Sequence, residues 1–144
     1  MVDHLKNDLL SACLDSNIYI SAIAFHGKPL KVIEAAFDRD FLLVCSPLIL
    51  EEVERNIINK LDVSSDRLKQ FINDVASISS MYIPTGNLKI INYEPDNLIL
   101  EIALIGGADV LVTGDKKHLL PLHKYHGIII EPPSQFLKRL DQNS

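Results

Sequence analysis

Cysteine, aromatic residues and long apolar runs are all scarce in this sequence of 144 residues. The two cysteines, Cys13 and Cys45, lie in separate apolar stretches without the C-x-x-C spacing of zinc or redox sites, so we expect reduced thiols in a protein core. No apolar run is long enough to cross a bilayer, and residues 1–10 lack the apolar segment of a secretion signal. We therefore expect a cytoplasmic protein that is neither secreted nor inserted in a membrane.

An excess of basic residues is also absent, because the formal net charge is -5 at pH 7. Proteins that bind nucleic acid non-specifically normally carry a basic surface, so this charge counts against strong binding of that kind. Aromatic residues make up 6% of the chain and form no pattern of stacking platforms. The sequence also suggests no serine–histidine or cysteine–histidine catalytic triad.

Apolar residues, in contrast, are plentiful enough to build a core. The chain is 47% hydrophobic and 23% charged, which is a globular composition. Together with the length, it predicts a single domain over 1–144, with its core at about 11–140. No internal repeat or low-complexity tract divides it.

Short apolar strands alternate with helical segments along the chain. Strands are expected at 11–15, 41–45, 79–83, 110–113 and 128–130. Helices are expected between and after them, with Ser46 as a cap before Pro47, at 17–25, 29–38, 47–60, 65–76, 96–106, 116–124 and 133–140. This alternation predicts a three-layer α/β/α domain with a parallel sheet of about five strands.

Two of these strands run directly into an aspartate, Asp15 in one case and Asp115 in the other. The carboxyl ends of parallel strands form the edge where α/β domains place their chemistry, and Asp96 opens the helix before the second strand. Each aspartate could instead cap a helix, which contributes about 0.5–2 kcal/mol. Capping does not require two aspartates at strand ends of one sheet, so the pattern favours a metal site.

The helix at 47–60 carries three glutamates that helical geometry separates. Glu51 faces away from the apolar stripe, beside Arg55, and is expected in solvent. Glu52 and Glu54 flank the stripe on opposite sides, and Glu52 is nearer the start of the helix. Glu52 is therefore the better candidate to reach the strand ends.

Several segments together resemble the PIN-domain family. They are LDSNIYISA at 14–22, Ser46-Pro47 with Glu52-Val53, DNLILE at 96–101, ADVLVTGD at 108–115 and EPPSQFL at 131–137. Within that family the chain looks most like the toxin components of toxin–antitoxin pairs. The resemblance implies a parallel sheet flanked by helices.

Carried over by position, the resemblance also implies an acidic cluster with polar neighbours. The implied catalytic residues and metal ligands are Asp15, Glu52, Asp96 and Asp115. The polar positions that would orient carboxylates or bound water are Asn17, Ser46 and Thr113. Many relatives carry two aspartates in a longer loop before the third acid, whereas here the upstream acid is Glu94, which is a further candidate ligand.

Four carboxylates suit metal-assisted hydrolysis of a phosphodiester. Mg²⁺ and Mn²⁺ prefer oxygen ligands, so an acidic pocket attracts these cations first, and the bound cations can then bind phosphate. The negative net charge of the chain is therefore compatible with a nucleic-acid substrate. The resemblance implies a Mg²⁺- or Mn²⁺-dependent endoribonuclease that acts on single-stranded RNA and is restrained by an antitoxin protein. Similar proteins form homodimers, for which apolar helix faces within 29–38 or 47–76 offer a surface.

Other readings stay open beside this one. The alternative is a non-catalytic PIN-like module that binds RNA or protein; the altered loop before Asp96 allows it, and the retained acids oppose it. An aspartyl phosphotransferase also has an aspartate after its first strand, but usually a second one two residues later, where this chain has Asn17. A cluster of basic residues forms either a positive rim for RNA or a solvated helix face and turn: Lys116, Lys117, His118, His123, Lys124 and His126.

Overall fold

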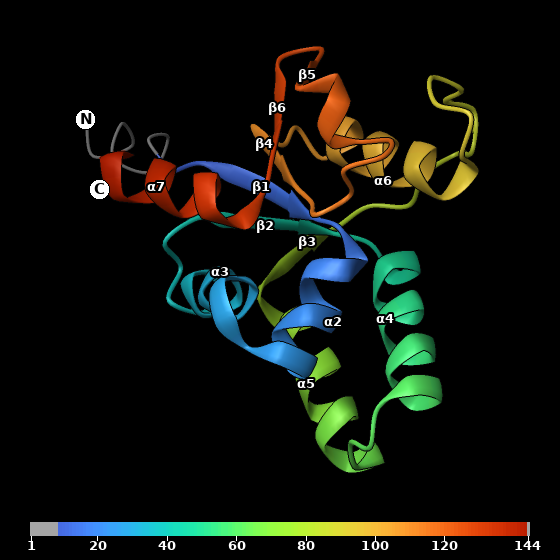
Figure 1. The fold of residues 1–144 in the computed structure, drawn as a ribbon, viewed down its shortest axis with the longest axis vertical. Helices are drawn as coiled ribbons and strands as arrows, with labels where there is room; N and C mark the ends of the chain where they lie inside the picture. The colour runs from blue at the N-terminus through green and yellow to red at the C-terminus, as the bar shows by residue number, and fades with distance from the viewer. Residues whose placement is uncertain (1–8, 144) are drawn as a thin grey trace.

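The computed structural model describes residues 9–143, which form a sheet between layers of helices (Figure 1). The N-terminal stretch discussed above therefore lies, up to residue 8, outside the described part. The strand order is β3-β2-β1-β4-β6-β5. The bounds are β1 Ser11–Leu14, β2 Leu42–Cys45, β3 Ser79–Met81, β4 Val110–Val112, β5 Lys124–Tyr125 and β6 Ile128–Glu131. All neighbours pair in parallel except β5 and β6, so the predicted parallel α/β fold is confirmed.

The central strands are short and apolar because helices cover both of their faces. The side chains of Ala12, Cys13 and Leu14 are fully buried, and so are those of β4. Both cysteines are buried and free, as predicted.

Helices form a layer on each side of the sheet. In Figure 1, α2 to α5 lie below the sheet, and α6 crosses above it, where it contacts β1, β2 and β4. The last helix, α7, contacts α3 and β4, and its Phe136 ring meets Phe41 edge to face. The bounds are α2 Ser16–Phe25, α3 Gly27–Phe37, α4 Pro47–Lys60, α5 Ser65–Ile78, α6 Glu94–Ile105 and α7 Pro133–Asn143.

The ends of two helices follow the predicted local chemistry. The hydroxyl of Ser46 accepts the backbone N–H of Leu48 and caps α4 before Pro47. Gly107 follows α6 in the left-handed conformation, with φ of 66°. However, α6 begins at Glu94, two residues before the predicted start at Asp96.

The helix predicted at 116–124 was wrong. That segment holds turns, a short 3-10 helix η1 (Leu120–Leu122) and the sixth strand, β5, which was not predicted. A proline at the start of η1 cannot donate a backbone hydrogen bond, and β5 then pairs with β6 around a tight turn. In that turn His126 and Gly127 both have positive φ, at 48° and 83°.

None of the helices in residues 9–143 combines the length and the hydropathy that a membrane span requires.

Candidate metal centre

The sheet brings three of the predicted site positions to one edge. Because β2, β1 and β4 are neighbours in that order, their carboxyl ends lie side by side. Asp15, Ser46 and Thr113 are the residues that immediately follow these strands. The strand ends therefore supply the floor of a site, as expected for a parallel sheet.

All four predicted acids line a single pocket at this edge. Asp15 and Asp115 come from the strand ends, Glu52 from α4 and Asp96 from the first turn of α6. Asn17, another predicted position, lines the same pocket and is exposed.

Asp15 is buried and held by hydroxyl groups. Thr113 Oγ1 donates a hydrogen bond to Asp15 Oδ2 at 2.8 Å, and Ser16 Oγ donates to Oδ1 at 3.4 Å. Burial raises the pKa of Asp15, against the hydrogen bond from Thr113, and the charges of Glu52 and Asp115 add to the rise. Its side chain makes no capping bond to α2, so capping does not account for this aspartate.

Asp115 is held by the turn that it organises. Its carboxylate accepts three backbone N–H groups at 3.0 to 3.2 Å, those of Lys117, His118 and Leu119. Its own backbone N–H donates to Thr113 Oγ1 at 3.0 Å, so one hydroxyl contacts both strand-end aspartates. Burial opposes ionisation, but the Asp96 carboxyl and the backbone donors together lower the pKa of Asp115. The Asp115 side chain therefore caps the turn that follows it, in contrast to Asp15.

Asp96 is the least satisfied acid of the group. Its side chain is only 9% exposed, and in the described part of the chain its Oδ2 atom has no hydrogen-bond partner. Burial and the neighbouring Asp115 carboxyl raise the pKa of Asp96 to about 7, with smaller contributions from Asp15 and Glu52. A buried oxygen without a partner is costly, so this position is suited to a cation.

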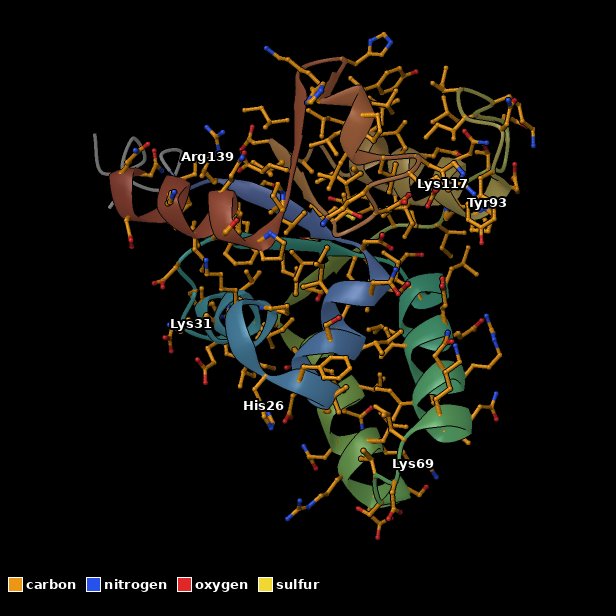
Figure 2. All side chains as sticks on the ribbon, viewed as in Figure 1. His26, Lys31, Lys69, Tyr93, Lys117 and Arg139 are labelled. Atoms are coloured by element: carbon orange, nitrogen blue, oxygen red, sulfur yellow. The ribbon has the colours of Figure 1, made fainter. Side chains whose placement is uncertain are left out.

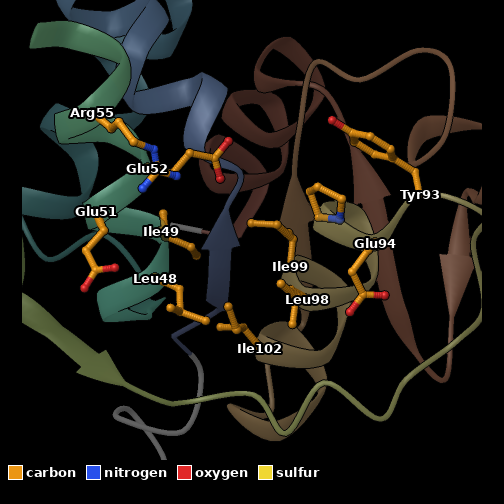
Figure 3. A pocket seen from close by; sticks show the side chains of 11 residues that line it. Leu48, Ile49, Glu51, Glu52, Arg55, Tyr93, Glu94, Leu98, Ile99 and Ile102 are labelled. Atoms are coloured by element: carbon orange, nitrogen blue, oxygen red, sulfur yellow. The ribbon is translucent and has the colours of Figure 1, made fainter. Parts of the chain in front are cut away.

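The other glutamates separate as helical geometry predicted. Glu52 is half-buried and faces the pocket, whereas Glu51 is exposed and does not line it. Glu94 is exposed and forms an ion pair with Lys89 at 3.0 Å. In Figure 3 the Glu94 side chain points away from Glu52, and Glu94 is absent from the lining of the acidic pocket.

The remaining predicted positions have different surroundings. Ser46 is fully buried and caps α4, but it does not line the acidic pocket. Of the basic cluster beyond Asp115, only Lys117 and His118 line the pocket. Figure 2 labels Lys117 and Tyr93, which both line this pocket.

Sequence reasoning missed two polar residues of α6 that hold the loop before it. Asn97 Oδ1 accepts the backbone N–H groups of Ile90 and Ile91, at 3.0 and 2.9 Å. Glu101 accepts hydrogen bonds from the backbone N–H groups of Thr85 and Gly86, at 2.7 and 3.0 Å. The signal available was their polar character on a largely apolar helix, at positions that the structure shows to be buried.

The sequence also did not single out His118 as a neighbour of two acids. Its Nδ1 atom lies 3.3 Å from Asp96 Oδ2 and 3.6 Å from Asp115 Oδ2. Tyr93 stacks on the imidazole, with 5.0 Å between ring centroids and 15° between the planes.

The donor set suits a hard divalent cation. Carboxylate oxygens approach from four separate chain segments, and one of these oxygens is buried and accepts no hydrogen bond from any residue that the structure describes. The negative charges also raise the pKa values of Asp15 and Asp96, so a bound cation would relieve repulsion.

Comparison with known proteins identifies a family and a relative in fold. A family model described as PIN domain matches residues 11–117. Among solved structures, the chain is similar to the crystal structure of VapBC2 from Rickettsia felis bound to a DNA fragment from their promoter. The TM-score is 0.61 and the identity 18%, over 85% of this chain and 98% of that chain, which is a likeness of fold. No curated protein matches.

Proposed function

We propose that this chain, which belongs to the PIN-domain family, is a metal-dependent endoribonuclease. Its proposed reaction is the hydrolysis of phosphodiester bonds in single-stranded RNA. The observation that carries this proposal is the buried Oδ2 of Asp96, which accepts no hydrogen bond from the described residues and lies in a pocket lined by three other acids. An unsatisfied buried oxygen lowers the free energy of unfolding by about 1–3 kcal/mol. If Asp96 bound no ligand, replacing it would therefore make the fold more stable.

In this proposal Asp15, Glu52, Asp96 and Asp115 hold Mg²⁺ or Mn²⁺. The bound ion would neutralise the substrate phosphate and lower the pKa of a water molecule. Thr113 positions Asp15 and Asp115 through its hydroxyl, and the turn after Asp115 fixes that carboxylate. The exposed Lys117 at the pocket rim can contact a phosphate of the RNA backbone.

The proposed partners follow from the motifs that resemble toxin components of toxin–antitoxin pairs. We include an antitoxin protein that restrains the nuclease in the cytoplasm, and a second copy of the chain in a homodimer. The acidic net charge of -5 fits a nuclease that binds phosphate through cations better than one that relies on a basic surface.

The test is cleavage of labelled single-stranded RNA by the purified protein, with Mg²⁺, with Mn²⁺ and with EDTA. We expect cleavage to require an ion and its rate to fall by at least about 100-fold in Asp15→Asn and Asp115→Asn. Loss of a residue that only supports a metal ligand costs up to about 100-fold, so loss of a ligand itself should cost at least as much. Cleavage that survives EDTA or both substitutions would contradict the proposal.

A matched pair on α4 supplies the control. Glu52→Gln should lose cleavage, whereas Glu51→Gln, one position away and outside the acidic pocket, should retain it. If the wild-type protein binds RNA without cutting it under any of these conditions, the non-catalytic PIN-like module is the better description. Double-stranded RNA and single-stranded DNA in parallel reactions test the substrate class.

A further inference from the structure

His118 places a nitrogen atom among the acidic side chains. One ligand atom from each of Asp96, Asp115 and His118 can be chosen so that all three lie within 4.8 Å of one another. The imidazole Nδ1 is the atom that faces both carboxylates, at 3.3 and 3.6 Å. The His118 side chain is 30% exposed, so it lies at the inner wall of the pocket and not free in solvent.

The ring is held in this position from two sides. The backbone N–H of His118 donates to Asp115 Oδ1 at 3.2 Å, which fixes the start of the side chain. Tyr93 covers one face of the imidazole by stacking. Because both contacts leave the ring edge directed at the acids, Nδ1 is preorganised toward the pocket.

We propose that His118 Nδ1 ligates the same ion as Asp96 and Asp115, and that this nitrogen makes the site select Mn²⁺ over Mg²⁺. The inference rests on the proposed function, since it concerns the ion of that site. It goes beyond it in adding a ligand that the acidic cluster does not include and in choosing between the two ions.

The spacing of the three groups supports a shared ion. Ligand atoms bonded at about 2.1 Å to one ion lie about 3.0 Å apart at right angles and about 3.4 Å apart in a tetrahedron. The Nδ1 distances of 3.3 and 3.6 Å are close to these edges, so little movement is needed to close the shell. Asp96 Oδ2, the nearer of these two carboxylate oxygens to Nδ1, accepts no hydrogen bond from residues 9–143, so its lone pairs can bind an ion.

The ligand chemistry determines the choice of ion. Mg²⁺ is bound mainly through oxygen and keeps several waters, whereas imidazole suits transition-metal ions. Mn²⁺ accepts carboxylates and lies on the transition-metal series, so it gains from a mixed oxygen and nitrogen site. A site of carboxylates and water alone would discriminate less between the two ions.

The experiment measures the bound ion directly and needs no enzymatic activity. Pulsed electron paramagnetic resonance of Mn²⁺ bound to the wild-type protein should show coupling to a directly bonded ¹⁴N nucleus. Calorimetric titration with Mn²⁺ and Mg²⁺ gives the selectivity, which is the ratio of the dissociation constant for Mg²⁺ to that for Mn²⁺. In His118→Asn, whose amide oxygen can take the place of Nδ1, we expect the ¹⁴N coupling to vanish and the ratio to fall by about 10-fold or more.

His126→Asn is the matched control, because it makes the same exchange at an exposed histidine that does not line the pocket. It should retain both the coupling and the selectivity. Mn²⁺ that binds the wild-type protein and is lost in Asp115→Asn, but shows no ¹⁴N coupling, would overturn the role of His118 and leave the proposed function intact. Absence of any specific Mn²⁺ or Mg²⁺ binding would overturn both.

Discussion

Two buried carboxylates on α6, Asp96 and Glu101, differ in their hydrogen bonding and in the direction of their pKa shifts. Glu101 accepts the hydroxyl and the backbone N–H of Thr85 and the backbone N–H of Gly86, and these hydrogen bonds lower its pKa despite burial. Asp96 lies about one turn earlier, has an oxygen that accepts no hydrogen bond within residues 9–143, and has a pKa raised to about 7. The same helix thus carries a satisfied acid and an unsatisfied one.

The difference distinguishes an acid that stabilises the fold through hydrogen bonds from an acid that is a candidate metal ligand. Glu131 resembles Glu101 in this respect, because both of its oxygens accept hydrogen bonds from Arg139 at 2.8 Å. Burial alone therefore does not mark the functional carboxylates in this chain. The distinguishing feature is a buried oxygen that accepts no hydrogen bond from the described residues.

The largest expected effect is stabilisation by a divalent ion. At about 100 times its dissociation constant, Mn²⁺ or Mg²⁺ should raise the free energy of unfolding by about 2.7 kcal/mol, since the ion binds only the folded state. Asp96→Asn should lose most of this gain and Glu101→Gln should keep it. Chemical denaturation with and without the ion measures both. Equal stabilisation of the wild-type protein and Asp96→Asn would remove the distinction.

The next effect concerns the satisfied acid. Glu101→Gln replaces one acceptor oxygen by an amide group that opposes an N–H donor, so we expect a loss of about 2 kcal/mol in ion-free buffer. Hydrogen exchange at the amides of Thr85 and Gly86 should accelerate, because these amides donate to Glu101. As a control, Glu51→Gln on the exposed face of α4 should stay within about 0.5 kcal/mol. An unchanged stability of Glu101→Gln would break the comparison.

The unsatisfied acid should respond with the opposite sign. Without ions at pH 8, Asp96→Asn removes a charge that is repelled by Asp15, Glu52 and Asp115, so the free energy of unfolding should rise by about 1–2 kcal/mol. Thermal or urea unfolding measures the change. A clear loss of stability would show that Asp96 serves the fold, as Glu101 does.

The smallest effect is the pH dependence of that gain. Because the pKa of Asp96 is raised to about 7 in the folded state, the folded protein holds a proton that the unfolded chain releases at lower pH. This contribution is complete in acid and is lost as the pH rises through 7. Because one pKa unit corresponds to about 1.4 kcal/mol, the advantage of Asp96→Asn at pH 8 should disappear by pH 5. Asp15, Glu52, Asp115 and His118 face the same carboxyl. A gain independent of pH would show that the titration of Asp96 does not cause it.

The sequence predicted the parts of the molecule that depend on local pattern. Asp15 and Asp115 follow apolar strands that are recognisable without a structure, and helical periodicity separates Glu52 from Glu51. The placement of these acids around one pocket then follows from the neighbouring positions of β1 and β4. Whether they bind a metal remains a prediction.

The missed features depend on partners far from a residue in sequence or on its loop geometry. The helix expected at 116–124 has a cap in Asp115, whose carboxylate accepts the first N–H groups, but Pro121 lacks the N–H that would continue the helix. Asn97 and Glu101 bind main-chain groups, which carry no sequence signal. The role of His118 beside two acids required the conformation of the turn.

The Thr113 hydroxyl has an evolutionary consequence. It donates to Asp15, which is 98 positions away, and accepts the backbone N–H of Asp115. Two distant parts of the chain therefore share one small group whose single proton has a fixed direction. Among related sequences, position 113 should vary only together with position 15, and a residue lacking a hydroxyl at 113 should accompany the loss of the aspartate at 15.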